Sequence, residues 1–376
     1  MSIRQMFPGS IVKPGFDPLA AQTSTFAYNL FTWGQGTNGQ LGLGNTTYYS
    51  SPKQVGALTD WLNIASGYFH SISVKSDGTL WTWGRNNQGQ LGLGNLTHYS
   101  SPKQVGALTA WSKVAGKGNF TVSIKTDGTL WSWGLNNFGQ LGLGDNGNRS
   151  SPVQVGALTS WLNIACGKYH TIAVKTDGTL WTWGRNTFGQ LGLSNYVDKS
   201  SPNQVGALTN WITVAGGALH TLAVKTDGTF WSWGYNAVGQ VGLANTAIYY
   251  SSPTQVGALT NWLSTAGGGY FSAAIKTDGT FWSWGQGNQG QLGLGNTTTY
   301  SSPKQVGSLT TWSKLATGLR FSTAIKTDGT LWSWGQNNAG QLGLGNTTYK
   351  SSPNQVGATT TWLSIACGGY WSISRG

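Results

Sequence analysis

A Trp-Gly pair recurs seven times along this chain, and each pair opens a run that is rich in Gly, Asn and Gln. Successive pairs are separated by 50, 50, 50, 50, 51 and 50 residues. The tryptophans of these pairs are Trp33, Trp83, Trp133, Trp183, Trp233, Trp284 and Trp334. A unit of about 50 residues with several short strands cannot bury its own apolar faces, so it must pack against copies of itself. Nearly the whole chain is therefore one repeated unit, and most of its apparent motifs belong to the scaffold.

The composition favours short strands joined by tight turns. Among 376 residues there are 57 Gly and 21 Trp but no Glu, which disfavours helices. Only 9% of the residues are charged, yet the formal net charge is +12, which favours approach to anionic surfaces. The basic residues are scattered over the repeats rather than gathered in a patch, so the charge does not indicate a nucleic-acid-binding protein.

One repeat, residues 61–110, predicts a four-stranded antiparallel sheet. Short apolar or alternating runs lie at residues 61–65, 70–75, 79–83 and 101–105. Asp77-Gly78 stands between the second and third runs, and Asp-Gly is a strong hairpin signal because Gly accepts the positive φ that such turns need. Four strands in about 50 residues is the size of a propeller blade.

The two ends of the repeated region complement each other. Residues 362–376 contain only the first two strands of a unit, whereas the pattern after residue 28 begins with the third strand. Residues 28–56 and 362–376 would together form one blade, a closure that removes open sheet edges. We therefore predict an all-β protein in which residues 28–376 form a seven-bladed β-propeller whose N- and C-terminal strands share one blade.

No group of residues in the sequence predicts catalysis. His70, His170 and His220 share a position that holds Phe or Trp in other repeats, which favours a space-filling ring. Cys166 and Cys367 share a position with Ser, Gly and Thr, as expected of a small buried filler. The repeated tryptophans are expected to fill the seams between blades. No paired carboxylates, activated nucleophile or metal-ligand spacing is found, so we predict a non-enzymatic protein without a cofactor or metal.

The repeats vary on one side only. In such a blade the first and third connections share one face of the ring, while the second connection and the link to the next blade share the other. The second connection and the link hardly change, whereas the first and third connections vary in aromatic, basic and small polar residues, a mixture typical of binding loops. Unconstrained drift of these loops would give the same pattern. The candidate binding residues are Tyr68, Phe69, Arg85, Tyr99, Phe138, Arg149, Tyr169, Arg185, Phe188, Tyr196, Tyr235, Tyr249, Arg320 and Tyr349.

The repeat resembles that of the regulator of chromosome condensation family. The resemblance rests on Lys-Thr-Asp-Gly-Thr-Leu-Trp-Ser-Trp-Gly followed by Asn-Xaa-Xaa-Gly-Gln-Leu-Gly-Leu-Gly, and it covers residues 28–376. It implies a seven-bladed propeller, but members include a nucleotide exchange factor, ubiquitin-ligase modules and a photoreceptor, so the fold does not choose the function. The even spacing leaves no room for the projecting loop of the exchange factor, and the Gly-Trp-Arg-His-Thr signature of the photoreceptor is not found.

Residues 1–27 lie outside the repeat and are predicted to form an extended arm. They resemble the start of many tailed-phage structural proteins, and they contain neither a secretory signal nor a span for membrane insertion. The leading hypothesis is a phage virion protein of the tail, fibre or capsid surface, made in the host cytoplasm. Its variable face would recognise a host-surface polysaccharide or protein, and its arm would bind other virion proteins through Arg4, Met6, Phe7 and Phe16. The alternative is an intracellular protein-interaction scaffold of the same family.

Overall fold

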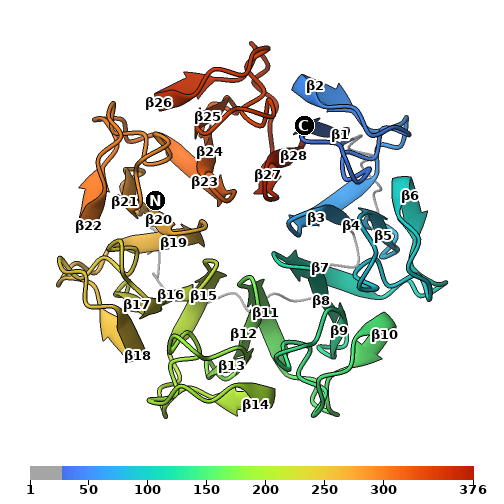
Figure 1. The fold of residues 1–376 in the computed structure, drawn as a ribbon, viewed down its shortest axis with the longest axis horizontal. Coiled ribbons are helices and arrows are strands. Elements are labelled where there is room, and N and C mark those ends of the chain that lie inside the picture. The colour runs from blue at the N-terminus through green and yellow to red at the C-terminus, as the bar shows by residue number, and fades with distance from the viewer. Residues whose placement is uncertain (1–27) are drawn as a thin grey trace, which may run out of the picture.

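The computed structural model describes residues 28–376, which form seven four-stranded antiparallel sheets arranged as blades around a central axis (Figure 1). No helix is found in this part of the chain, and so nothing helical in it could cross a membrane. The first strand of each blade lies nearest the axis and the fourth lies at the rim (Figure 1). The prediction of an all-β seven-bladed propeller is confirmed.

The strands follow the same order in every repeat. Blade 1 contains β3 (Trp61–Ser66), β4 (His70–Lys75), β5 (Leu80–Gly84) and β6 (Tyr99–Gln104), and blade 2 contains β7 (Trp111–Gly116), β8 (Phe120–Lys125), β9 (Leu130–Gly134) and β10 (Arg149–Gln154). Blade 3 contains β11 (Trp161–Cys166), β12 (His170–Lys175), β13 (Leu180–Gly184) and β14 (Lys199–Gln204), and blade 4 contains β15 (Trp211–Gly216), β16 (His220–Lys225), β17 (Phe230–Tyr235) and β18 (Tyr249–Gln255). Blade 5 contains β19 (Trp262–Gly267), β20 (Phe271–Lys276), β21 (Phe281–Gly285) and β22 (Tyr300–Gln305), and blade 6 contains β23 (Trp312–Thr317), β24 (Phe321–Lys326), β25 (Leu331–Gly335) and β26 (Lys350–Gln355).

The seventh blade is the predicted composite of the two ends. Its strand order is β2 (Tyr49–Gln54), β1 (Leu30–Gly34), β28 (Trp371–Arg375) and β27 (Ser364–Cys367). The pair of β1 with β28 runs in register from Leu30 opposite Arg375 to Gly34 opposite Trp371. This pairing closes the ring without leaving the central strands of the blade unpaired.

The hairpin between the second and third strands forms as its sequence predicts. Asp77 Oδ1 accepts hydrogen bonds from the amide and the hydroxyl of Thr79, at 2.8 and 2.7 Å, while Gly78 adopts a φ of +76°. The fourth strand begins earlier than predicted, at Tyr99 rather than at residue 101. The difference arises because Tyr99 pairs with Gly84 across a shift in register.

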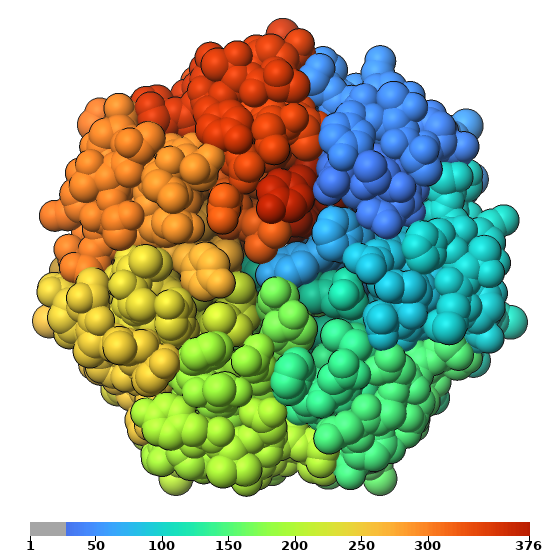
Figure 2. All heavy atoms as spheres, in the orientation of Figure 1, coloured from blue at the N-terminus to red at the C-terminus, as the bar shows by residue number. Residues whose placement is uncertain are grey.

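The core lies in the seams between blades. One cluster joins Phe120, Val122 and Leu130 of blade 2 to Trp161 and Trp183 of blade 3, and the other seams have equivalent clusters. Figure 2 shows the blades in close contact around the ring. The predicted seam role of the tryptophans is thereby confirmed for these residues.

The three repeated histidines do more than fill space, because each one links two blades. His70 Nε2 lies 2.9 Å from Thr121 Oγ1 of the next blade, and His170 and His220 make equivalent contacts with Thr221 and Ser272. The Thr121 hydroxyl already donates to the carbonyl of Gln90, so Nε2 carries the proton and donates. Sequence comparison within the chain gave no sign of these bonds, since Phe takes the same position elsewhere.

Candidate binding face

The first and third connections of each blade lie on one face of the ring, which we call the variable face. The amide of Arg85 in the third connection of blade 1 donates to the carbonyl of Phe69 in the first connection, at 2.8 Å. The amide of Arg185 makes the same bond to Tyr169 in blade 3, at 2.9 Å. Residues that differ between repeats are therefore held side by side by bonds that do not depend on their side chains.

Arg185 is the centre of a cluster on this face. Its guanidinium carbon lies 4.9 Å from the ring centre of Phe138, 5.6 Å from that of Tyr169 and 5.4 Å from that of Phe188. Phe138 and Tyr169 also pack edge to face, with ring centres 5.2 Å apart. Three aromatic rings from blades 2 and 3 thus hold one planar cation, which gives it a fixed orientation.

The cluster extends across blade 4 to blade 5. Phe188 packs against Tyr235 at 5.2 Å and against Tyr249 at 5.6 Å between ring centres. Tyr249 contacts the exposed Tyr196, and Tyr235 contacts Tyr270 of blade 5. Offset and edge-to-face contacts of this kind each contribute about 0.5–1.5 kcal/mol beyond the area that they bury.

On its other side the cluster continues to blade 1. The Lys168 ammonium lies 4.9 Å from the ring centre of Tyr169 and 5.9 Å from that of Tyr68. Tyr68 packs against Phe69, and Arg85 lies 5.4 Å from the Phe69 ring. We call the whole series the aromatic band. It consists of Tyr68, Phe69, Arg85, Phe138, Lys168, Tyr169, Arg185, Phe188, Tyr196, Tyr235, Tyr249 and Tyr270.

Ten of the fourteen predicted binding residues belong to this band, and two of its members, Lys168 and Tyr270, were not among the predicted residues. Both lie in the first connection of a blade. Tyr270 occupies the repeat position of Phe69 and Tyr169, so an aromatic residue at that position was the signal that could have identified it.

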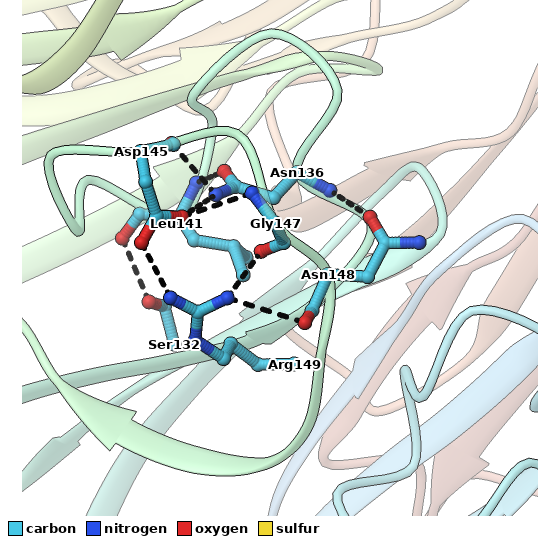
Figure 3. A network of polar contacts seen from close by, with 7 residues as sticks. All are labelled: Ser132, Asn136, Leu141, Asp145, Gly147, Asn148 and Arg149. Carbon is cyan, nitrogen blue, oxygen red and sulfur yellow. Dashed lines mark hydrogen bonds and ion pairs between the residues drawn. The ribbon is translucent and has the colours of Figure 1, made fainter.

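Four predicted residues lie outside the band. Arg149 belongs to a network within its own loop, where it contacts Asp145 Oδ2 at 2.5 Å and donates to the carbonyl of Gly147 at 2.8 Å (Figure 3). Tyr99 accepts from Asn95 at 3.3 Å, and Tyr349 accepts from Gln336 at 3.4 Å. Arg320 is half-buried in the first connection of blade 6. These residues form no common cluster.

The Arg149 network shows why the third connections hold their shape. Asn136 donates from its side chain to the carbonyl of Asp145 at 2.9 Å, and its Oδ1 accepts from the amide of Leu141 at 2.9 Å (Figure 3). Asn148 Oδ1 accepts from the amide of Asn136 at 2.8 Å. Hydrogen bonds within the loop hold its shape. The residue at a position such as Arg149 can therefore differ between repeats because of its role in the loop, without any role in binding.

The aromatic band carries positive charge that no carboxylate of the described residues balances. The ion pairs found within residues 28–376 are Lys75 with Asp60 and Arg149 with Asp145. On the variable face, Asp198 accepts a backbone hydrogen bond from Asn186 at 2.6 Å. Arg85, Lys168 and Arg185 therefore present cations among aromatic rings, whereas six of the carboxylates sit in the hairpins of the opposite face.

Tyr68 forms the buried base of the band. Only 9% of its surface is exposed, and its hydroxyl makes no hydrogen bond. Burial raises the pKa of its phenol far above the usual range, and the neighbouring Tyr169 adds to the shift. The phenol therefore stays neutral and serves as a packing surface rather than as an acid or a base.

No group of three or more His, Cys, Asp or Glu residues that could hold a metal ion occurs in the described part of the chain. Arg4, Met6, Phe7 and Phe16, which were predicted to anchor the arm, lie outside the described residues. The geometry of the band suits non-covalent recognition, because it combines fixed aromatic surfaces with cations that have no counter-ion.

Several solved structures share this architecture. Prp20p from Saccharomyces cerevisiae, studied for its binding to Gsp1p and histones, has a TM-score of 0.83 at 23% identity, over 94% of this chain and 92% of that one. Human WBSCR16 has a TM-score of 0.83 at 22% identity, over 93% of this chain and 99% of that one. Yeast RCC1 (Prp20) bound to Kap60 gives 0.83 at 20% identity, over 100% and 96%. At these identities the likeness shows the fold alone.

Comparison with curated protein sequences gives no match. Family profiles do match. The RCC1-like domain covers residues 19–213, and the regulator of chromosome condensation (RCC1) repeat covers residues 227–275, 278–325 and 328–374. The first of these matches alone spans more than half of the chain, and the three repeats continue it almost to the last residue. The chain belongs to the regulator of chromosome condensation (RCC1) repeat family.

Proposed function

We propose that this chain is a non-catalytic interaction scaffold that binds a protein partner through the aromatic band. The observation that carries the proposal is the contiguity of the band, which joins loops of five blades in a molecule whose other surfaces are nearly repeated. Aromatic residues and Arg are enriched in the centres of protein interfaces, and a few such residues carry most of the binding energy. A propeller of similar fold, the yeast protein Prp20p (RCC1), was studied for its binding to Gsp1p and histones and was solved bound to Kap60, which supports a protein as the partner class.

The virion role predicted from the sequence is a finer and separate proposal. It depends on residues 1–27, which lie outside the described residues, and the partners named for similar structures offer it no support. Host-surface recognition would use the same band, so the two proposals differ in where the protein resides and in what it binds. We place the interaction scaffold first because the partners named for similar structures are proteins and offer no support for a virion role.

The band can be tested with substitutions at two of its half-buried residues and with a matched control. Arg185→Ala and Tyr235→Ala should each weaken the partner by about 30-fold or more, because truncation of a central aromatic or Arg contact costs 2 kcal/mol or more. Tyr349→Ala removes a tyrosine of the same face outside the band and should leave affinity unchanged.

The measurement begins with the immobilised full-length chain and an extract of the cells that produce it. The retained protein is identified by mass spectrometry, purified, and titrated against each variant by calorimetry. Equal affinity for all three variants would remove the band from the interface. If the protein is instead recovered on purified virus particles, as shown by gold-labelled antibody, the virion proposal replaces the scaffold.

A further inference from the structure

The seven first strands line a central channel with small side chains. Its cavity has a volume of about 350 Å³. One layer consists of seven alanines, one from each blade. The next layer consists of Ser66, Gly116, Cys166, Gly216, Gly267, Thr317 and Cys367. Cys166 and Cys367, predicted to be buried fillers, are free thiols on the wall of this channel, where Cys166 is buried and Cys367 is half-buried. The small residues at these positions keep the axis open.

Lys117 is the one residue of this lining that departs from the repeat in size and charge. The other six blades have Gly at the equivalent position, namely Gly67, Gly167, Gly217, Gly268, Gly318 and Gly368. The reason for Gly is steric, because a Cβ placed on Gly167 would lie 2.0 Å from the ring of His170, and the other five meet the ring three residues on in the same way. Blade 2 alone accepts a side chain there.

The side chain of Lys117 crosses the channel. It starts on blade 2, and its Nζ donates to the carbonyl of Gly267 on blade 5. The amine therefore lies inside the cavity, at the level where the first strands end beneath the variable face. The lining of the channel contains Ser and Thr hydroxyls, thiols and backbone groups but no carboxylate.

The Lys117 ammonium is consequently a cation without a counter-ion. Burial lowers the pKa of Lys117 to about 8, so it remains largely protonated at pH 7. The groups that face it are the thiols of Cys166 and Cys367 and the imidazoles of His170 and His220. Burial raises the pKa of both thiols and lowers the pKa of both imidazoles to about 3, so all four are neutral near pH 7 and none can balance the charge.

We propose that the channel around Lys117 binds a small oxyanion, a carboxylate or a phosphate. The anion would supply the negative charge that the wall lacks, and the Ser66 and Thr317 hydroxyls lie in the same lining as further donors. The volume of about 350 Å³ is at the lower end of the range for small-molecule sites, which limits the ligand to a compact ion. This site is separate from the aromatic band and does not depend on the proposed protein partner.

The test uses the repeat itself to design the variant. Lys117→Gly restores the residue of the other six blades, and Lys117→Gln removes the charge while keeping much of the chain length. Lys350→Gln removes a cation of blade 6 that lies outside both the channel lining and the aromatic band, and it serves as the control. Inorganic phosphate and succinate are titrated separately into the full-length chain at pH 7, with calorimetry and thermal unfolding as readouts.

The wild type and Lys350→Gln should bind at least one of the two anions and gain thermal stability with its concentration. Both Lys117 variants should lose at least tenfold in affinity. Binding of phosphate alone or of succinate alone would support the site and identify its anion class. The proposal is overturned if neither anion binds the wild type, or if the Lys117 variants bind as well as the wild type. A Lys117→Gly chain that is less stable but binds equally would make Lys117 a brace between blades 2 and 5.

Discussion

The hydrogen bonds that link neighbouring blades also keep the imidazoles of His70, His170 and His220 in the neutral state. Each imidazole is fully buried and donates from Nε2 to a hydroxyl of the next blade, while its Nδ1 has no hydrogen-bond partner. A proton on Nδ1 would therefore place an unpaired charge in the seam. Burial lowers the pKa of all three histidines to about 3.

This arrangement predicts an acid-sensitive ring. The pKa of each imidazole is lower in the folded state, about 3, than in the unfolded state, 6.5. The unfolded chain thus binds more protons between these values, so stability is fully present above pH 6.5 and is lost as the pH falls toward 3. Each histidine can contribute a loss of up to about 1.4 kcal/mol per pH unit. Chemical unfolding measured from about pH 7.5 to about pH 4.5 should show this slope.

A matched variant is available within the chain. Phe takes the same position in blades 2, 5 and 6, as Phe120, Phe271 and Phe321, so the triple His→Phe variant should fold. Its unfolding free energy should be nearly flat between about pH 6.5 and about pH 4.5, where the carboxylates have not yet been protonated. A slope as steep as that of the wild type would show that other groups cause the acid sensitivity.

The residue scale also shows where sequence reasoning stops. The aromatic character of Phe138, Tyr169 and Phe188 and the face that they share could be predicted, because repeat positions fix the connection in which a residue lies. The contacts of Arg185 with all three rings could not, since they depend on how far loops of adjacent blades reach toward each other. Arg149 was predicted to bind a partner because it lies in a variable connection. Its guanidinium instead pairs with Asp145 of its own loop.

At the scale of the element, the third connection explains one group of glycines. Gly142 has a φ of +74°, and a Cβ there would lie 2.7 Å from Trp183 Nε1 of the next blade. The loop must therefore lie directly on the indole. Gly156 has a φ of +61°, and nothing lies within 4 Å of its Cβ position. It therefore also needs a positive φ, but a Cβ there would meet no neighbouring atom.

Substitution by Ala should lower the free energy of unfolding by different amounts at Gly142 and at Gly156. Gly156→Ala should destabilise the protein by about 1–2 kcal/mol, the cost of a left-handed conformation for a residue with a Cβ. Gly142→Ala should add a further cost of about 1–3 kcal/mol, because the loop and the indole must separate. Denaturant unfolding of both variants checks this. Equal losses would mean that the loop moves away from Trp183 without cost.

The elements themselves were largely predictable. Local sequence patterns that occur in every repeat predict the Asp-Gly hairpins, the four strands of a blade and the burial of Trp133 in a seam. The ends of the fourth strands were not predictable, because Tyr99 enters the sheet through a register shift opposite Gly84, and such a shift has no single residue as its signature.

At the scale of the molecule, the composite blade carries the closure of the ring. β28 pairs with both β1 and β27, and Trp371 donates from its indole to the carbonyl of Tyr68 in blade 1 at 3.1 Å. Removal of residues 371–376 should leave two unpaired strand edges and cause a large loss of thermal stability with aggregation. Circular dichroism and light scattering would measure both.

A circular permutant provides the control for this truncation. Asn29 and Gly376 are hydrogen-bonded to each other, so a short linker can join residue 376 to residue 28 in a chain that starts at residue 107, between blades 1 and 2. The permutant should fold with all seven blades. If the truncated chain unfolds at the same temperature as the full chain, the composite blade does not hold the ring together.

The pairing of β1 with β28 also determines when the ring can close relative to translation. A ribosome adding about 5–20 residues per second makes the roughly 340 residues that separate the two strands in about 20–70 s. During this time blades 1 to 6 can assemble in sequence as they emerge, but β1 and β2 remain a lone hairpin with an open edge. β28 is the last strand of the propeller to be translated, and it is the partner that β1 needs. The ring can therefore close only after β28 has left the ribosome, and a chaperone that shields the first hairpin would act during that interval.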